Sequence, residues 1–326
     1  MTLGVPVVML YKYNICGFRA AEARRIVYAP DVERIAEQVI GMPEQSGIVW
    51  IASYPKSGNT WVRAFLHSLA RQQNGESGEQ DINEMSRFST WDLDKKRYAD
   101  FLGFEPDNSE HRQEIAATRH AVHRQIADST ENIVLIKTHN CLVTDRGHST
   151  VNFDVTAGAI YILRNPLDIA ISYAHHSGAS IDDAIERMSA VDAETNGTPF
   201  AVYEVQGSWS QHVWSWTRNP NRALRVVRYE DMVADPKKEF AAIAEHLLFK
   251  PTPSQLKKAI KASSFARLQA QEQEKGFRER PPIASQNFFR EGRAGQWREV
   301  LSPAQIDRIV RDHGEQMQRF GYLPIE

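Results

Sequence analysis

The sequence is poor in the features that mark several large classes of protein. Only two of its 326 residues are cysteines, Cys16 and Cys141, which excludes a disulfide-dense secreted scaffold and favours a reducing, cytoplasmic location. No apolar run reaches the roughly eighteen residues that a membrane-spanning helix needs, so no transmembrane segment is predicted. Lys and Arg (39) nearly balance Asp and Glu (41), which argues against a nucleic-acid partner.

The remaining composition is that of an ordinary globular protein, with 42% hydrophobic and 25% charged residues. The length allows one large domain or two of ordinary size. Two polar stretches, Gln72–Asp81 and Gln271–Gln286, are predicted to be irregular, but neither resembles a linker between domains. We therefore predict a single domain over residues 47–326, with residues 1–46 as an N-terminal extension packed on it.

Short apolar runs rich in β-branched residues alternate with helical patterns along the chain. The helical patterns include Thr60–Ala70, a segment opened by Asp235-Pro236 and a last helix opened by Ser302-Pro303. This alternation predicts a P-loop-like α/β fold of three layers, in which helices flank a central parallel β-sheet. Ligands of such folds bind at the carboxyl ends of the strands. The predicted strands are Gly47–Ser53, Ile133–Lys137, Ala159–Leu163 and Leu224–Tyr229.

The loop after the first predicted strand, Tyr54–Trp61, has the composition of an anion site. It leads into a helix, whose first backbone N–H groups can bind phosphate, and Lys56 adds positive charge. It is not the G-x-x-x-x-G-K-[ST] loop, because its one glycine follows the lysine. An ordinary ATP or GTP site is therefore disfavoured. The alternative for this loop is a plain strand–helix turn with an exposed lysine.

A second candidate anion site follows the strand that ends at Leu163. Arg164 can hold a phosphate through two hydrogen bonds, Pro166 fits the first turn of a helix, and Ser172 lies further along that helix. The alternative is that Arg164 pairs with Asp168 and that Ser172 only packs.

The tripeptide Lys137-Thr138-His139 follows a predicted central strand and offers a candidate general base. A neutral imidazole can take the proton of an acceptor hydroxyl, and a nearby lysine can stabilise negative charge on a leaving group. The chain has eleven histidines, and they offer no convincing ligand set, so no metal is predicted.

In this order and spacing, these segments resemble the sulfotransferases that use 3′-phosphoadenosine 5′-phosphosulfate (PAPS), in a cytosolic-type, bacterial-like form. Tyr54–Trp61 is similar to the family's 5′-phosphosulfate loop, with Asn59 where threonine is frequent. Lys137-Thr138-His139 matches the family's K-T-H, and Arg164–Ser172 is similar to its 3′-phosphate motif. The matched segments run from about Gly47 to Trp297.

Two further segments resemble the same family. Phe289–Arg298 is similar to the R-K-G-x-x-G-x-W segment that closes on the 3′-phosphate, but Glu291 stands where a lysine is usual. An acid beside a phosphate repels it, so Glu291 is expected to point outward or to be compensated by Arg293 or Arg298. Ser263-Ser264-Phe265 is similar to a T-S-F element that touches the adenine.

The resemblance implies a role for each matched residue. His139 is assigned as general base, with Lys56 and Lys137 as electrostatic catalysts, and Trp61 is expected to stack on the adenine. For Tyr229 and Phe265, which would approach the adenine, core packing is the alternative. The residues expected to bind PAPS are Lys56, Ser57, Gly58, Asn59, Thr60, Trp61, Arg164, Ser172, Tyr229, Ser263, Phe265, Arg290 and Gly292.

The resemblance implies transfer of a sulfuryl group from PAPS to a hydroxyl, or to an amine, of a small-molecule acceptor. Two alternatives remain on the same fold, a P-loop nucleotide kinase and a non-catalytic nucleotide-binding scaffold. The family's C-terminal dimer motif is absent, since Ser302-Pro303 replaces its T-V, and the oligomeric state stays open with a homodimer among the alternatives.

The acceptor pocket has candidate lining residues in two places. One of the adjacent histidines, His175 or His176, is expected to face it. Five aromatic side chains of the segment between the first helix and the strand that carries the base also offer a lining, with ordinary core packing as the alternative; these are Phe88, Trp91, Tyr98, Phe101 and Phe104.

Overall fold

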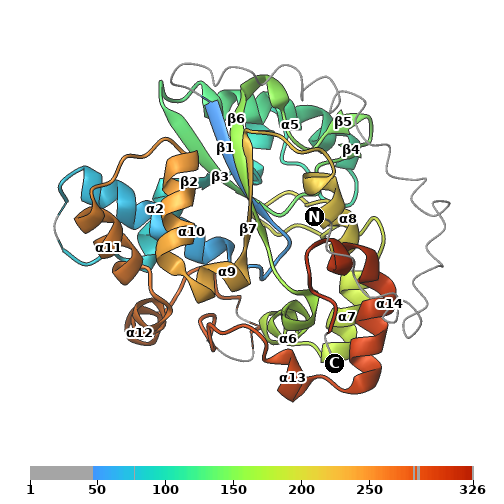
Figure 1. Ribbon diagram of the computed structural model, residues 1–326. Coiled ribbons are helices and arrows are strands. Elements are labelled where there is room, and N and C mark those ends of the chain that lie inside the picture. The colour runs from blue at the N-terminus through green and yellow to red at the C-terminus, as the bar shows by residue number, and fades with distance from the viewer. Residues whose placement is uncertain (1–46, 77, 282, 285–286, 325–326) are drawn as a thin grey trace.

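Five parallel strands form the centre of the molecule (Figure 1). The computed structural model describes residues 47–324 apart from residues 77, 282, 285 and 286, so the predicted extension over residues 1–46 lies outside the described residues. The predicted α/β fold with a parallel sheet is confirmed. Across the sheet the strands are β2 (Ser89–Trp91), β3 (Ile133–Thr138), β1 (Gly47–Ser53), β6 (Thr156–Leu163) and β7 (Leu224–Arg228).

Four of these strands coincide with the sequence prediction except at their ends. β1 is buried along its whole length, which explains its uninterrupted apolar sequence. β6 starts at Thr156 rather than Ala159, because Gly158 pairs with Val49 of β1 despite its low strand propensity. Tyr229 was expected to end a strand, and it begins a helix instead.

Alternate residues of β1 face two separate hydrophobic cores. Trp50 packs in one core and Ile51 in the other.

The first core lies under α5 (Arg112–Ala127) and α8 (Trp209–Thr217) and continues into α6 (Pro166–Ser177), α7 (Ile181–Ser189) and α14 (Pro303–Arg319). The second lies under α2 (Asn59–Gln73), α9 (Tyr229–Ala234), α10 (Pro236–His246) and α11 (Pro253–Ala262). The three layers of Figure 1 follow from this division.

The remaining elements are short or peripheral. They are α3 (Met85–Phe88), α4 (Lys95–Leu102), α12 (Phe265–Lys275), α13 (Trp297–Val300) and the antiparallel pair β4 (Thr144–Asp145) and β5 (His148–Ser149). The stretch from Gln271 was predicted to be irregular, yet α12 continues to Lys275, since Gln, Glu and Lys are good helix formers and Gln271 and Glu272 are buried.

Two helix starts confirm the capping signals in the sequence. The Asp235 side chain accepts a hydrogen bond from the backbone N–H of Lys238, and Pro236 opens α10. Ser302 and Gln305 form a capping box at the start of α14.

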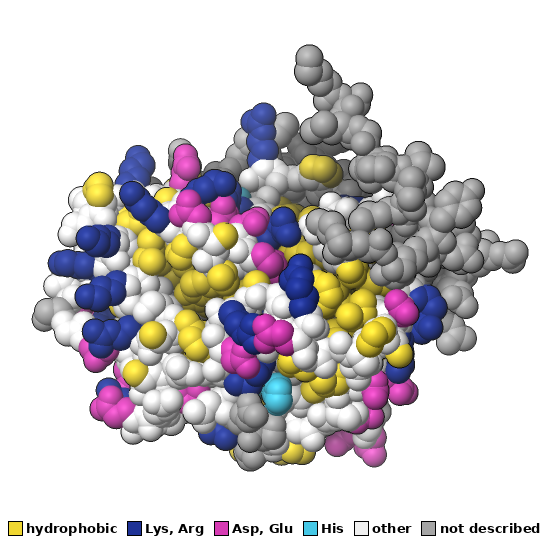
Figure 2. Space-filling view, turned by 60° about the horizontal axis from the view of Figure 1, so that its bottom comes forward, with side chains coloured by type: hydrophobic (Ala, Val, Ile, Leu, Met, Phe, Trp, Pro, Cys, Tyr) yellow, Lys and Arg dark blue, Asp and Glu magenta, His cyan; other side chains and the backbone are white. Residues whose placement is uncertain are grey.

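Charges of both signs are interspersed over the face of the molecule seen in Figure 2. This mixing agrees with the formal net charge of −2. None of the helices in the described part of the chain is both long and apolar enough to cross a membrane.

Candidate active site

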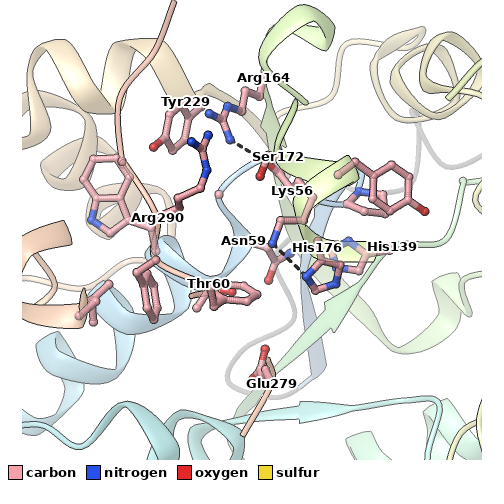
Figure 3. A pocket seen from close by; sticks show the side chains of 18 of the residues that line it. Lys56, Asn59, Thr60, His139, Arg164, Ser172, His176, Tyr229, Glu279 and Arg290 are labelled. Carbon is pink, nitrogen blue, oxygen red and sulfur yellow. Dashed lines mark hydrogen bonds between the residues drawn. The ribbon is translucent and has the colours of Figure 1, made fainter. Parts of the chain in front are cut away.

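A cleft opens at the carboxyl ends of β3, β1, β6 and β7 (Figure 3). The order of the strands determines the position of the cleft, because the residues that follow these parallel strands lie side by side at one edge of the sheet. Sequence segments as distant as Lys56 and Arg290 meet there. Of the residues predicted to act or to bind PAPS, those that line the cleft are Lys56, Gly58, Asn59, Thr60, Trp61, Lys137, His139, Arg164, Ser172, Tyr229, Phe265, Arg290 and Gly292.

The loop between β1 and α2 turns sharply to present the helix N-terminus to the cleft. Lys56 has φ of 69° and Gly58 has φ of 107°, both in the left-handed region. A Cβ on Gly58 would lie 2.8 Å from the Tyr229 ring, so glycine is also required by space. The Asn59 side chain donates to the Ile51 carbonyl oxygen at 2.8 Å, which ties α2 to β1. In the first turn of α2 the N–H groups of Trp61 and Val62 donate to the Gly58 carbonyl oxygen, whereas those of Asn59 and Thr60 have no partner among the described residues and are free to bind an anion.

Arg164 lies at the opposite wall of the cleft, directly after β6. Its guanidinium donates to the Lys56 carbonyl oxygen at 2.9 Å and lies 4.2 Å from the centre of the Tyr229 ring. The side chain is buried, and its Nε–H has no hydrogen-bond partner among the residues that the structure describes. A buried donor without a partner is costly, and an anion in the cleft would satisfy it.

The pairing of Arg164 with Asp168, the alternative weighed from the sequence, does not occur. The Asp168 carboxylate instead accepts hydrogen bonds from the backbone N–H groups of Gly295 and Trp297, at 2.6 and 3.0 Å. Asp168 therefore fastens the C-terminal glycine-rich segment to the start of α6, and no carboxylate neutralises the Arg164 guanidinium within the described residues, where it donates to the carbonyl oxygens of Lys56 and Arg293.

Glu291 sits on the surface and is compensated by both neighbouring arginines. Its carboxylate pairs with Arg290 and accepts from Nε of Arg293 at 2.7 Å. Arg293 is shared with Glu299, also at 2.7 Å. The expected compensation by Arg293 is thus present, but the pairing also engages the Arg290 guanidinium, which contacts the Gln296 side chain as well.

Aromatic side chains form the part of the cleft near the start of α2. The Trp61 ring meets the Tyr229 ring edge to face, with 5.8 Å between centroids. Gly292 has φ of 64°, and a Cβ there would lie 2.2 Å from the Phe265 ring, so the glycine backbone rests directly on that ring. Tyr229 also belongs to the second hydrophobic core, so it is both a core residue and part of the cleft lining, and its contact with the adenine stays a prediction.

The imidazole of His139 is held by the backbone of β1. Nδ1–H donates to the Ser53 carbonyl oxygen at 2.7 Å, and a carbonyl only accepts, so Nδ1 carries the proton. Nε2 is then the acceptor nitrogen, and it makes no hydrogen bond to the described residues. Burial, followed by the charge of Lys137, lowers the pKa of His139 well below its usual value. The side chain is therefore neutral near pH 7, as a general base must be.

Two lysines flank the imidazole. Burial, with Arg164 and then Lys137 nearby, lowers the pKa of Lys56 to about 7. Its Nζ lies 3.3 Å from Nδ1 of His176 and 3.9 Å from the centre of the Phe288 ring. Lys137 Nζ lies 3.7 Å from a carboxylate oxygen of Glu279.

Some predicted residues lie outside the cleft lining. Ser57 is buried, and its hydroxyl makes no hydrogen bond within the described part of the chain. Ser263 is buried at the end of α11, where its hydroxyl donates to the Ala259 carbonyl oxygen. None of the five aromatic candidates lines the cleft: Tyr98 is fully buried, Phe88 packs on the second core, and Trp91, Phe101 and Phe104 are exposed at the surface.

Sequence reasoning missed several lining residues from irregular segments. Glu204 and Gln206 lie between α7 and α8, while Glu279 and Phe288 follow α12. No spacing or periodicity marks these positions, because they reach the cleft through tertiary contacts alone. Of the adjacent histidines, His176 lines the cleft and His175 does not.

Glu279 links the segment after α12 to the catalytic edge of the sheet. Its carboxylate accepts two hydrogen bonds from the buried guanidinium of Arg63, at 2.7 and 2.9 Å, besides its contact with Lys137. These cations outweigh its burial and lower the pKa of Glu279 to about 2, so it is ionised at neutral pH.

Comparison with known proteins identifies the family. The family model described as "Sulfotransferase domain" matches residues 47–321, and the chain therefore belongs to the sulfotransferase family. It is 26% identical over 285 residues to sulfotransferase 1A1 of Canis lupus familiaris, covering 83% of each chain. It is 24% identical over 291 residues to flavonol 3-sulfotransferase of Flaveria bidentis, covering 84% of this chain and 83% of the relative. The family confirms a sulfotransferase enzyme and disfavours the kinase alternative.

A solved structure supports the fold independently. The crystal structure of mouse sulfotransferase SULT7A1 complexed with PAP matches with a TM-score of 0.54 and 18% identity, covering 88% of this chain and 90% of that chain. This likeness confirms the arrangement of strands and helices.

Proposed function

We propose that this sulfotransferase moves a sulfuryl group from PAPS to a hydroxyl of a small-molecule acceptor, by in-line displacement with His139 as general base. The observation that carries the proposal is the convergence of one neutral imidazole, two lysines and two separate anion-binding walls in a single cleft. The catalytic domain in this proposal is residues 47–326.

His139 would accept the hydroxyl proton at Nε2 while the acceptor oxygen bonds to sulfur and the bond from sulfur to the bridging oxygen breaks. The electron pair of the broken bond stays on that oxygen, and the second product is adenosine 3′,5′-bisphosphate (PAP). The hydrogen bond from Nδ1 to Ser53 keeps Nε2 available for this proton.

Lys56 and Lys137 would stabilise the negative charge that grows on the sulfuryl and bridging oxygens. Both Nζ atoms lie in a partly enclosed cleft, where an ammonium group interacts with a developing negative charge more strongly than in water. The lowered pKa of Lys56 means that an incoming anion also favours its protonation.

The nucleotide would lie across the two anion-binding walls. The loop from Ser57 to Thr60 suits the 5′-phosphate, while Arg164, Ser172 and Arg290 suit the 3′-phosphate. The aromatic part of the cleft, formed by Trp61, Tyr229 and Phe265, suits the adenine. Ser263 is not on the cleft surface, and a role for it would be indirect.

Calorimetric titration tests the proposal directly. The protein is titrated with PAP, with AMP and with ATP in the absence of magnesium. A clear preference for PAP is expected, because only PAP fills both anion sites. No binding of PAP, or tighter binding of ATP, would contradict the proposal. Binding of PAP with no transfer from PAPS to any hydroxyl acceptor would favour the scaffold alternative.

A further inference from the structure

The part of the cleft around His139 combines polar side chains with aromatic rings. Figure 3 shows His139, His176 and Glu279 away from Arg164 and Arg290. Glu204 adjoins His139, and Gln206 adjoins Glu204. Among the described residues that line the whole cleft, the aliphatic side chains are Pro55 and Leu268, and Leu268 packs in the core cluster that contains Phe289. The apolar surface at this end of the cleft is therefore aromatic rather than aliphatic.

Glu204 is the carboxyl group at this end that forms no ion pair with the described residues; burial raises its pKa, and the charge of Lys137 opposes that rise. One carboxylate oxygen accepts from the backbone N–H of His139 at 3.2 Å, and the other accepts from the Gln206 side chain at 3.2 Å. No Lys, Arg or His of the described chain forms an ion pair with it, whereas Glu279 is paired with both Arg63 and Lys137. A carboxylate has about four lone-pair sites, so roughly two remain open on Glu204.

The position of Glu204 is fixed by the segment that carries it. Its backbone N–H donates to the Thr195 hydroxyl at 2.8 Å, and its carbonyl accepts from the Thr195 N–H at 2.9 Å. The next residue, Val205, donates to the Asn140 side chain at 2.8 Å, and its carbonyl accepts from the Cys141 N–H at 2.7 Å. The backbone at Glu204 is therefore fixed on both sides, and the side chain starts from a defined position beside His139.

We propose that the acceptor carries a hydrogen-bond donor next to the hydroxyl that is sulfated, as a sugar or an amino sugar does, and that Glu204 binds this donor. The inference rests on the proposed function. A carboxylate only accepts hydrogen bonds, so its ligand must bring O–H or N–H groups. Keeping an acid here without a paired cation costs desolvation energy, which such a ligand repays in the complex.

Aromatic surface is present where a sugar ring needs it. Phe288 and Tyr173 both line the cleft, and Phe288 lies beside His176, with 5.9 Å between ring centroids. Gln206 adds a second polar side chain beside Glu204. Acid, amide and aromatic groups together match the alternating polar edge and apolar face of a pyranose.

The test compares three acceptors that share one aryl group, with PAPS as donor. They are p-nitrophenol, p-nitrophenyl β-D-glucopyranoside and p-nitrophenyl 2-amino-2-deoxy-β-D-glucopyranoside. We expect kcat/KM for at least one sugar to exceed that for the phenol by tenfold or more. Preference for the glucoside would identify a neighbouring hydroxyl as the partner of Glu204, and preference for the amino sugar would identify an ammonium group.

The variant Glu204→Gln tests whether Glu204 causes the preference for the sugar acceptor. In Glu204→Gln, KM for the preferred sugar should rise at least tenfold while the Kd of PAP stays within twofold. Glu245→Gln, an exposed site on α10, is the matched control and should change neither value. Failure to sulfate either sugar, a sugar-to-phenol ratio below ten, or an unchanged KM in Glu204→Gln would overturn the inference. The proposed function would survive those results if PAP binds, and it fails separately if PAP does not.

Discussion

The carbonyl oxygen of Ser53 accepts a hydrogen bond of 2.7 Å from Nδ1 of His139. Ser53 ends β1, and His139 follows β3, the neighbouring strand, whose Thr138 is in register with Ala52. Sheet pairing therefore brings the imidazole and the carbonyl together and sets the tautomer. In this site a backbone carbonyl, rather than a carboxylate side chain, orients the imidazole.

Replacing His139 should separate chemistry from nucleotide binding. In His139→Ala, kcat should fall by about 10²–10⁴-fold, the usual contribution of a general base, while the Kd of PAP changes little. Steady-state kinetics with PAPS and calorimetry with PAP measure the two effects. His148→Ala, on the β4–β5 pair, is the control and should behave like the parent protein. Unchanged turnover in His139→Ala would remove the residue from the base role.

Lys56 should take up a proton when PAP binds. Its pKa is about 7 in the free protein because of burial and nearby cations, so at pH 8 most Lys56 side chains are neutral. A bound phosphate raises that pKa, and the affinity for PAP should consequently fall as pH rises above 7. Calorimetry at pH 8 in two buffers of different ionisation enthalpy should report uptake of about 0.5–1 proton. Lys56→Met should abolish most of this uptake; the same uptake in the variant would point to another group.

Arg164 should discriminate between ligands with and without a 3′-phosphate. A charge-assisted hydrogen bond contributes about 1.5–3 kcal/mol, so Arg164→Ala should weaken PAP binding by roughly 10- to 100-fold. AMP binding should change far less, because AMP lacks the 3′-phosphate. If the affinities for PAP and AMP fell equally, Arg164 would act by holding the loop of Lys56 in place, through its hydrogen bond to the Lys56 carbonyl oxygen, and not by binding the 3′-phosphate.

The sequence indicates the sheet and its catalytic edge well, for a physical reason. Parallel strands buried on both faces need uninterrupted apolar runs, and the segments proposed to bind phosphate follow these strands directly. The apolar run of β1 and the loop that contains Lys56 are therefore recognised together. β2 has only three residues at the sheet edge, too few to show a pattern. Glu204 and Glu279 lie on irregular segments that are far in sequence from His139, and only the folded chain brings them to it.

Glu291 should weaken the hold of Arg290 on a 3′-phosphate, because its carboxylate pairs with that guanidinium at the surface. An exposed ion pair is worth up to about 1 kcal/mol, so Glu291→Gln should tighten PAP binding by about two- to fivefold. AMP affinity should not change. Glu299→Gln is the matched control, since Glu299 pairs with Arg293 and not with Arg290. Weaker PAP binding in Glu291→Gln would show that the acid supports the site.

Buried histidines should make the protein acid-sensitive well before its carboxylates titrate. Burial lowers the pKa of His212 to about 3 and that of His313 to about 4, from 6.5 in the unfolded chain. Below pH 6.5 these histidines are protonated in the unfolded chain but stay neutral in the folded chain. The free energy of unfolding therefore falls as pH falls towards the folded pKa values.

His313 allows a test of this dependence of stability on pH, because it does not line the cleft. It lies on α14, and its ring packs against Trp209 of α8. A group of this kind should remove roughly 2 kcal/mol of stability between pH 8 and pH 5. Urea unfolding at the two pH values should therefore show a smaller loss for His313→Leu than for the parent protein. The same loss in both would mean that His313 is protonated in the folded chain at pH 5, and that the hydrogen bond of 2.9 Å between its Nδ1 and the Ser210 hydroxyl does not hold it neutral.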